Sequence, residues 1–326
     1  MLEQARRWAT TATVAAAAGA VSLVGAVPAA AGGTDIGDGH PTVVNCFHNS
    51  LALQPAIDGA APGETLLVKG TCVGPFTFSV DKNLTVTGEK HAALNGNRAG
   101  STVTVEAGVR LQLSHLTVIN GTGTATEPDA AIPGPLGGGI LNRGTLTVKE
   151  ATVAGNHANN GGGIFNEAGA TLNLIRSVVR HNTAADSGGG IRNQGTLTLS
   201  GSTLSDNSAD NGGGLANFGS ATLSGSKVRD NYADNGAGIL NANALTLNHS
   251  TVSRNTASLQ GGGIRTDGGT VNLTDSEVRH NTANGGIGSG GGIFNNGSTV
   301  TLDRSAVRDN RPDNCAPLGS VTGCTG

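Results

Sequence analysis

Residues 188–207 read GGGIRNQGTLTLSGSTLSDN, and the same pattern recurs through more than half of the chain. Each repeat opens with a glycine-rich triplet, and the seven openings are Gly137, Gly161, Gly188, Gly212, Gly236, Gly261 and Gly290. Successive openings lie 24 to 29 residues apart. A period in this range is typical of stacked repeat architectures, in which each repeat buries its apolar face against its neighbours.

Four columns of apolar side chains appear when the repeats are aligned on the asparagine that closes each one. The closing asparagines are Asn156, Asn182, Asn207, Asn231, Asn255, Asn281 and Asn310. Apolar residues stand three, eight and ten positions earlier, and another follows the glycines; in the quoted repeat these are Leu204, Leu199, Leu197 and Ile191. We therefore expect three short strands per repeat, separated by turns.

The repeat predicts an all-β fold: a right-handed, single-stranded parallel β-helix, or solenoid, of about 11 rungs. No segment of about ten residues within the repeats has helical periodicity, so leucine-rich and helical repeats are excluded. A second asparagine column follows the glycines, at Asn142, Asn166, Asn193, Asn217, Asn241 and Asn295. We interpret both asparagine columns and the glycines as structural, because asparagine side chains can bond main chain at turns.

The ends of the chain predict an exported single-domain protein. Residues 1–31 combine a basic start, an apolar middle and a small-residue end, which is typical of a cleaved signal peptide. The Sec route is preferred, with Arg6 and Arg7 leaving twin-arginine export as the alternative. We expect residues 32–326 to form one domain. Its first part, 32–120, contains irregular rungs and a capping helix at 49–60, and an excursion follows at 121–136. Seven regular rungs then occupy 137–310, and a cap at 311–326 ends the domain.

Four cysteines, Cys46, Cys72, Cys315 and Cys324, lie in two pairs near opposite ends of the mature chain. Export favours disulfides, and an elongated solenoid separates its ends by far more than the roughly 7 Å that a disulfide spans. The predicted bridges are therefore Cys46–Cys72 and Cys315–Cys324, and a four-cysteine zinc site is excluded for the same reason.

Net charge and composition limit the classes of partner that we expect the protein to bind. The net charge is −3 for the whole chain, and it becomes −4 when two arginines and one glutamate leave with residues 1–31. An acidic balance argues against a nucleic-acid partner. Aromatic residues make up 2% of the chain, so the usual platforms for stacking sugar rings are scarce. After signal cleavage we expect no membrane contact and a monomer.

With these motifs in view, the chain resembles secreted right-handed parallel β-helix repeat proteins of the pectate-lyase-like superfamily. Its GGGI and V/L-x-x-N pair, as in Gly261 to Ile264 after Val252 to Asn255, is similar to the GGAI and FxxN repeats of polymorphic outer membrane proteins. The resemblance implies the fold and leaves activity open. The NTD, DD, GHG and RIK motifs of galacturonase-like enzymes are absent from the sequence.

Candidate site residues are sought where the regular rung is broken, because function concentrates on loops that leave a scaffold. The excursions are 121–136, with Glu127 and Asp129, and 282–289. Outward positions after the glycines give a stripe containing Leu141, Phe165 and Arg192, a docking surface for a partner or for the first excursion. A third candidate is a carboxylate column before the glycines, which we expect to bind Ca²⁺ if any metal binds: Asp186, Asp210 and Asp234.

These patterns predict a secreted β-helix scaffold with a non-catalytic role. It would bind an extracellular polysaccharide or a surface protein through one long face. The alternative is a polysaccharide lyase or glycoside hydrolase that acts on an acidic or cell-wall glycan. No paired carboxylates with the spacing of glycoside hydrolysis can be recognised locally, so no catalytic residue is assigned.

Overall fold

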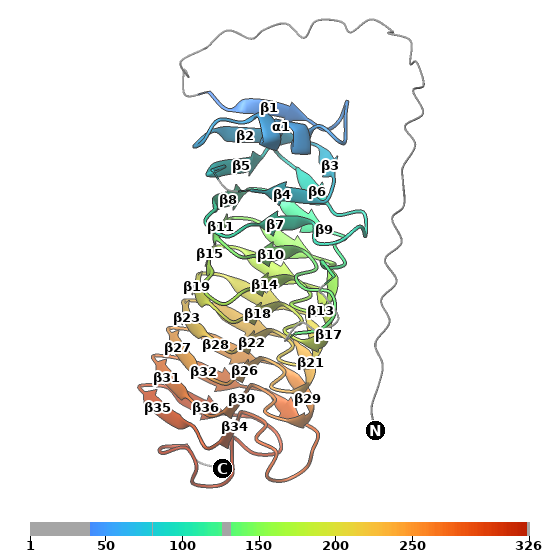
Figure 1. Ribbon diagram of the computed structural model, residues 1–326. Helices are drawn as coiled ribbons and strands as arrows, with labels where there is room; N and C mark the ends of the chain where they lie inside the picture. The colour runs from blue at the N-terminus through green and yellow to red at the C-terminus, as the bar shows by residue number, and fades with distance from the viewer. Residues whose placement is uncertain (1–39, 80, 126–131, 325–326) are drawn as a thin grey trace, which may run out of the picture. The chain divides into compact units, whose positions relative to one another are not determined.

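The structure is a computed structural model that describes residues 40–79, 81–125 and 132–324, and it shows a stack of short strands (Figure 1). All pairings between named strands are parallel, and within each sheet a strand pairs with its equivalent on the next turn. The predicted parallel β-helix is confirmed. The longest sheet has 11 strands, in agreement with the expected number of rungs.

Four sheets run along the stack, and we name them A to D. Sheet A contains β1 (Thr42–Asn45), β2 (Thr65–Lys69), β5 (Leu84–Gly88), β8 (Arg110–Ser114), β11 (Thr145–Lys149), β15 (Thr171–Ile175), β19 (Thr196–Ser200), β23 (Ser220–Ser224), β27 (Ala244–Asn248), β31 (Thr270–Thr274) and β35 (Thr299–Asp303). Sheet B contains β3 (Thr71–Val73), β6 (Ala93–Asn95), β9 (Thr117–Ile119), β12 (Thr152–Ala154), β16 (Val178–Arg180), β20 (Thr203–Ser205), β24 (Lys227–Arg229), β28 (Thr251–Ser253), β32 (Glu277–Arg279) and β36 (Ala306–Arg308).

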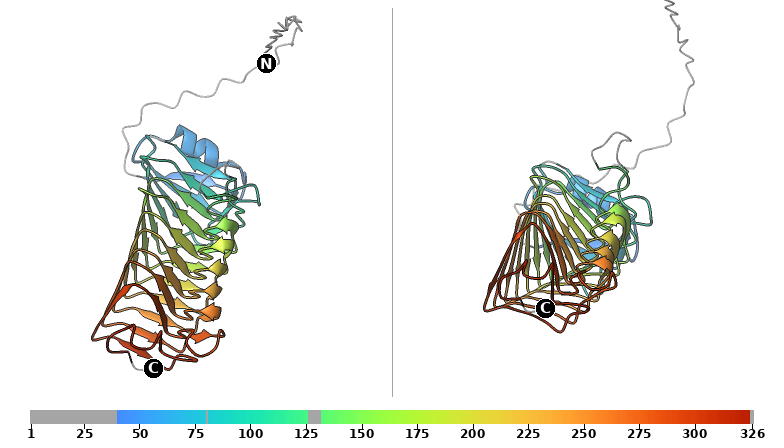
Figure 2. Two further views of the ribbon diagram at one scale, coloured as in Figure 1. Left: turned by 60° about the horizontal axis from the view of Figure 1, so that its bottom comes forward. Right: turned by 90° about the horizontal axis from the view of Figure 1, so that it is seen from below.

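Sheet C contains β4 (Phe76–Phe78), β7 (Val103–Val105), β10 (Ile140–Asn142), β14 (Ile164–Asn166), β18 (Ile191–Asn193), β22 (Leu215–Asn217), β26 (Ile239–Asn241), β30 (Ile264–Asp267), β34 (Ile293–Asn296) and β37 (Cys315–Ala316). Sheet D contains β13 (His157–Asn160), β17 (Thr183–Ser187), β21 (Ser208–Asn211), β25 (Tyr232–Asn235), β29 (Thr256–Gln260) and β33 (Thr282–Ala283). Seen nearly along the stack, the strands of successive turns lie over one another (Figure 2).

The regular rung has four strands, so the prediction of three strands was wrong. The fourth lies in sheet D, between the closing asparagine and the next glycine triplet. Its second residue is a buried alanine, and the column is Ala158, Ala184, Ala209, Ala233, Ala257 and Ala283. This small side chain stands two positions after each of the first six closing asparagines, where the surrounding polar residues hide the strand period.

The core is one continuous column that runs through the stack. The four apolar columns expected from the repeat point inward; in the third regular rung Ile191, Leu197, Leu199 and Leu204 are each at most 1% exposed. Only in the last rung are two of them, Val300 and Leu302, partly exposed. Burying each aliphatic side chain contributes about 1.5–3 kcal/mol before entropy is counted, so the stack has a sustained apolar driving force.

Two asparagine ladders hold consecutive rungs together. At the corner between sheets B and D, the Oδ1 of each closing asparagine accepts from both the backbone N–H and the side-chain Nδ2 of the preceding one, at 2.9–3.1 Å. At the corner between sheets C and A, the second column is linked by Nδ2 to Oδ1 bonds of 2.7–2.8 Å from Asn142 to Asn241. Asn241 then donates to the Oγ1 of Thr266.

A serine ladder at the corner between sheets A and B performs the same task. From Ser202 on, each serine hydroxyl oxygen accepts from the backbone N–H of the serine one rung earlier, at 3.0–3.2 Å; the ladder is Ser177, Ser202, Ser226, Ser250, Ser276 and Ser305. Buried backbone groups at turns must find partners, and these three ladders supply them at three corners of the rung. The distance between rungs is therefore held at each of these corners.

The glycine triplets occupy the fourth corner, where backbones pack closely. The first glycine needs a left-handed conformation, with φ +70° at Gly188. A Cβ on the third glycine would meet the carbonyl oxygen of the next rung; at Gly214 the distance to Gly238 O would be 2.6 Å.

Both ends of the stack are closed by elements that leave the repeat. Helix α1 (Leu53–Gly59) is shorter than the predicted 49–60. It buries Leu53 and Ile57, whereas Leu51, which precedes the helix, is 63% exposed. At the other end, β37 continues sheet C. Both predicted disulfides, Cys46–Cys72 and Cys315–Cys324, are present.

The predicted signal peptide, residues 1–31, lies outside the described residues. Within the described ranges, none of the helical segments is long and apolar enough to cross a membrane.

Candidate functional site

The first excursion packs on the stripe of sheet C that was predicted to dock either a partner or this excursion. Leu141 and Phe165 are at most 1% exposed, and they cluster with Leu136 and Ile132 of the excursion. The sequence left open whether a partner or the first excursion covers these two residues, and the structure shows that the excursion covers them. Leu141 and Phe165 thus offer no surface to a ligand here, because they are buried.

The polar candidates of the same excursion, Glu127 and Asp129, lie outside the described residues. The segment just before them borders a hollow of about 540 Å³ whose lining includes Thr77, Thr104 and Arg143. Arg143 bridges two carboxylates there, since its Nη1 lies 3.2 Å from an oxygen of Glu106 and its Nε lies 3.0 Å from one of Glu167. Each of these charges already has an opposite charge beside it.

Arg192, the third residue of the predicted stripe, is held against the scaffold. Its guanidinium lies 4.5 Å from the ring centre of Phe218 and 5.9 Å from that of Phe165, within range of cation–π attraction. Its Nη1 donates to Asn160 Oδ1 at 2.6 Å and to the Ser187 hydroxyl. Its side chain is 11% exposed, and Asp186 Oδ2 lies 3.6 Å away. Burial lowers the pKa of Arg192.

The predicted calcium column does not gather into a cluster. Asp186 pairs with Arg192, and Asp234 accepts a hydrogen bond from the Ser258 hydroxyl. Across the described part of the chain, there is no group of three or more His, Cys, Asp and Glu side chains placed to hold a metal ion. Calcium at Asp186, Asp210 and Asp234 stays a prediction.

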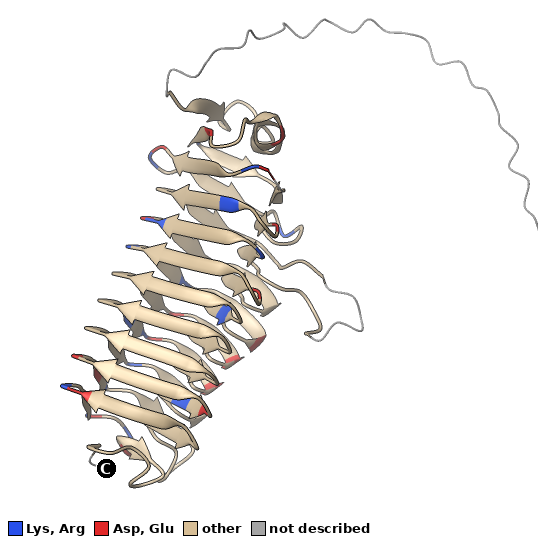
Figure 3. Ribbon diagram, turned by 60° about the vertical axis from the view of Figure 1, so that its left-hand side comes forward, with Lys and Arg blue, Asp and Glu red and all other residues tan. Residues whose placement is uncertain are grey.

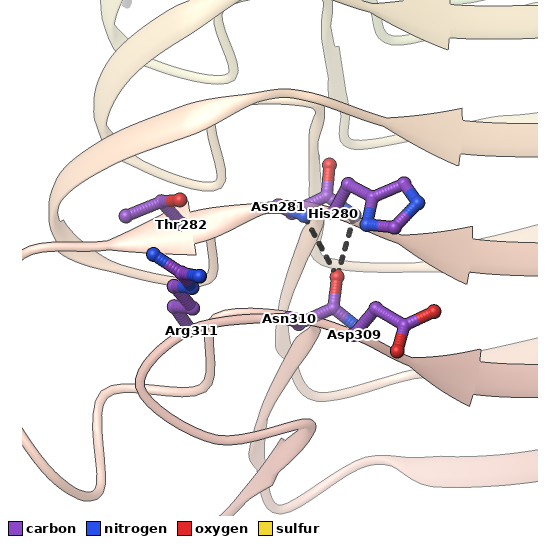
Figure 4. Close-up of a pocket in the computed structure, with 6 residues that line it drawn as sticks. All are labelled: His280, Asn281, Thr282, Asp309, Asn310 and Arg311. Atoms are coloured by element: carbon purple, nitrogen blue, oxygen red, sulfur yellow. Dashed lines mark hydrogen bonds between the residues drawn. The ribbon is translucent and has the colours of Figure 1, made fainter.

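A hollow of about 590 Å³ lies between two turns near the end of the stack (Figure 4). His280 and Asp309 point to one side of it, whereas Thr282 and Arg311 lie on the other. Between them, the Oδ1 of Asn310 accepts from the backbone and side chain of Asn281 at 2.9 and 3.0 Å. These asparagines are part of the ladder between rungs, so we assign the hollow no chemistry.

A surface without charge covers most of sheet A. Figure 3 shows this sheet with its charged residues confined to the edges and ends of the strands. The five consecutive strands β15, β19, β23, β27 and β31 read TLNLI, TLTLS, SATLS, ALTLN and TVNLT. Their outward positions contain neither a charged nor an aromatic residue, and hydroxyl and amide side chains predominate.

The outward side chains of sheet A form straight columns, because the register between strands is unbroken from β11 to β35. The first column is Thr145, Thr171, Thr196, Ser220, Ala244, Thr270 and Thr299. The second is Thr147, Asn173, Thr198, Thr222, Thr246, Asn272 and Thr301. We call these two columns the hydroxyl face. Sequence reasoning missed it, although its signal is the alternating T-x-T of the quoted repeat.

Sheet B provides an internal comparison for the hydroxyl face. On the rungs of β15 to β31, its outward positions carry five charged side chains, Arg180, Lys227, Arg229, Glu277 and Arg279. Threonine is favoured in any exposed strand, and this preference applies equally to both sheets. The lack of charge on sheet A is therefore a property of that face rather than of the fold.

We compared the chain with known proteins by sequence and by structure, and only the structural comparison gave a similarity. No protein-family profile matches the sequence, and no curated protein matches it. Among solved structures, the chain is similar to an alginate lyase from Paenibacillus sp. str. FPU-7, with a TM-score of 0.42 and 15% identity over 81% of this chain and 97% of that chain. We transfer no activity from this likeness. The β-helix class follows from the strand pairing itself.

Proposed function

We propose that this protein is a secreted, non-catalytic scaffold that binds an extended, repetitive ligand along the hydroxyl face of sheet A. The observation that carries the proposal is the set of in-register hydroxyl and amide columns, uncharged over five strands. Every rung from β15 to β31 offers at least one hydroxyl or amide group, with Ala244 the one apolar position in the two columns, so a ligand that repeats along the stack gains contacts at each rung.

Multivalency explains why weak contacts suffice on such a surface. A single exposed hydroxyl contributes little, since a hydrogen bond made in exchange for water is worth about 0.5–1.5 kcal/mol. Once the first rung is engaged, each further rung binds at high effective concentration. A long, stiff and repetitive scaffold is suited to this mode. The two disulfides fit the oxidising surroundings that export implies.

The test is adsorption of the mature protein to insoluble polysaccharides, measured as the fraction that sediments with each solid. The double variant Thr198→Lys/Thr246→Lys places two charges on the hydroxyl face, and Thr203→Lys/Thr251→Lys places two on sheet B of the same two rungs. Adsorption that the first variant loses and the second keeps supports the proposal. Equal adsorption by both variants would refute it.

A second candidate function is a polysaccharide lyase or glycoside hydrolase acting on an acidic or cell-wall glycan. The observation in its favour is Arg192, whose pKa burial lowers and whose guanidinium lies 3.6 Å from Asp186. Its enclosure by Phe218 and Asn160 favours a structural role instead. Release of reducing or unsaturated ends from a glycan panel, abolished by Arg192→Ala, would establish this activity in place of the scaffold.

A further inference from the structure

The spacing of the hydroxyl face identifies a class of ligand, and this inference rests on the proposed function. We infer that the face binds the crystalline surface of a polysaccharide of N-acetylated amino sugars, of which chitin is the simplest. The inference joins three features of sheet A: its repeat distance, its rigidity and its surface chemistry.

The repeat distance along the stack is set by amide hydrogen bonds. Neighbouring strands of sheet A are joined by backbone N–H to C=O bonds in unbroken register, which places equivalent side chains about 4.8 Å apart. Along each strand the two columns are two residues, or about 6.6 Å, apart. The hydroxyl face is therefore a two-dimensional lattice rather than a single row of groups.

A ligand meets every rung only if it repeats at the same distance. In crystalline N-acetylated polysaccharides, neighbouring chains stack through hydrogen bonds between their acetamido groups. That bond is the amide N–H to C=O bond of the β-sheet, so each repeat contains one amide-to-amide hydrogen bond with a donor–acceptor distance of about 2.9 Å. Chains stacked in this way are thus commensurate with the rungs of sheet A. Cellulose has no amide, so other contacts set its chain spacing.

Rigidity allows a match between lattices to persist over many rungs. Sheet A lies between the corner of the second asparagine column and the corner of the serine ladder, so both ends of its strands are fixed. Asn193 donates to Asn217 at 2.8 Å on one side, and Ser202 N–H donates to the Ser226 hydroxyl at 3.2 Å on the other. Because the face is ordered before binding, adsorption costs little conformational entropy.

The surface chemistry selects a neutral solid with hydroxyl and amide groups. From β15 to β31 the face has no charge to attract an acidic glycan. It has no aromatic side chain on which the ring of a single soluble sugar could stack. Threonine hydroxyls pair with sugar hydroxyls, and the Asn173 and Asn272 amides can both donate to and accept from acetamido groups.

The experiment compares adsorption isotherms of the mature protein on crystalline chitin, on the same chitin after deacetylation, and on crystalline cellulose. Wild type should adsorb to chitin with an apparent affinity about tenfold or more above that for either other solid. Thr198→Lys/Thr246→Lys should lose at least about tenfold on chitin, and Thr203→Lys/Thr251→Lys should stay within about twofold of wild type. Circular dichroism checks that both variants remain folded.

The outcomes separate this inference from the proposed function. Equal adsorption to chitin, deacetylated chitin and cellulose, lost in the sheet A variant alone, would overturn the chitin inference and leave the proposed function standing. Adsorption to none of the solids, or adsorption that the sheet A substitutions do not change, would overturn both. Competition by soluble chito-oligosaccharides as strong as that by the crystal would also overturn the inference, because a lattice match requires many chains at once.

Discussion

The asparagine ladder at the corner between sheets B and D predicts that a single buried amide supports two rungs. Asn231 is 1% exposed, and its side chain makes four hydrogen bonds. It accepts from the backbone N–H and the Nδ2 of Asn207 at 3.0 Å, and it donates to Leu204 O at 3.1 Å and Asn255 Oδ1 at 2.9 Å. Asn231→Ala removes all four.

The magnitude follows from which groups lose their partners. Asn207 Nδ2 keeps its bond to Val179 O, and Asn255 Oδ1 keeps its bond from the Asn231 backbone. The Asn207 backbone N–H loses its acceptor inside the stack, which costs about 1–3 kcal/mol, and the other three bonds are worth about 1 kcal/mol each. We expect Asn231→Ala to lower the free energy of unfolding by about 5 kcal/mol.

Urea denaturation followed by circular dichroism measures this loss. The matched control is Asn243→Ala, because the Asn243 side chain is exposed and makes one hydrogen bond, of 3.4 Å to Phe218 O. Its effect should stay within about 0.5 kcal/mol. A loss below about 1 kcal/mol for Asn231→Ala, at an unchanged denaturant slope, would refute the reasoning. In that case the ladder would form in the folded protein without contributing measurably to its stability.

Three further predictions concern the turns and the ends. Gly214→Ala should destabilise the protein by about 3 kcal/mol in urea denaturation, because the new Cβ would lie 2.6 Å from Gly238 O. The control is Ala237→Gly, at the neighbouring triplet position of the next rung, which should cost about 1 kcal/mol or less. The Arg254 guanidinium, hydrogen-bonded to Asp230, lowers the pKa of that carboxyl. The stabilisation from this ion pair is therefore complete above the pKa of the unfolded chain, near 3.8, and is lost as pH falls through the pKa of the folded protein. Asp230→Asn should be less stable than wild type at pH 7, and the two proteins should become equally stable in acid. A difference in the free energy of unfolding that persists in acid would contradict this prediction. Replacing Cys46 and Cys72 by alanine opens a loop with a sequence separation of 26 and should cost about 3.5 kcal/mol; an unchanged melting temperature would show that the N-terminal rungs do not need the bridge.

The fold was largely predictable because each part of the rung has a distinct residue signature. The glycine triplet, the closing asparagine and four apolar columns recur at fixed offsets, and the two disulfides followed from an elongated shape. The fourth strand was missed because its inward residue is alanine, as at Ala209, between polar neighbours that mask the alternation. The serine ladder at Ser202 and Ser226 is also readable as a column five positions before the closing asparagine.

The candidate site was less predictable, because which side chains are buried or covered by other segments is decided only when the chain folds. The stripe with Leu141 and Phe165 was expected to dock either a partner or the first excursion, and only the folded chain shows that the excursion covers both. Arg192 was expected to face a ligand, and it lies instead against Phe218 and Asn160. The hydroxyl face was overlooked because exposed threonines in strands are ordinary one at a time. Their meaning comes from stacking, since only the aligned rungs reveal a charge-free lattice on one sheet and charges on the next.

The most direct test of the account is the adsorption of three proteins to crystalline chitin: wild type, Thr198→Lys/Thr246→Lys and Thr203→Lys/Thr251→Lys. The account predicts that wild type and the sheet B variant bind alike, whereas the sheet A variant loses at least about tenfold in apparent affinity. Equal binding by all three proteins, or equal loss in both variants, would contradict the assignment of function to the hydroxyl face.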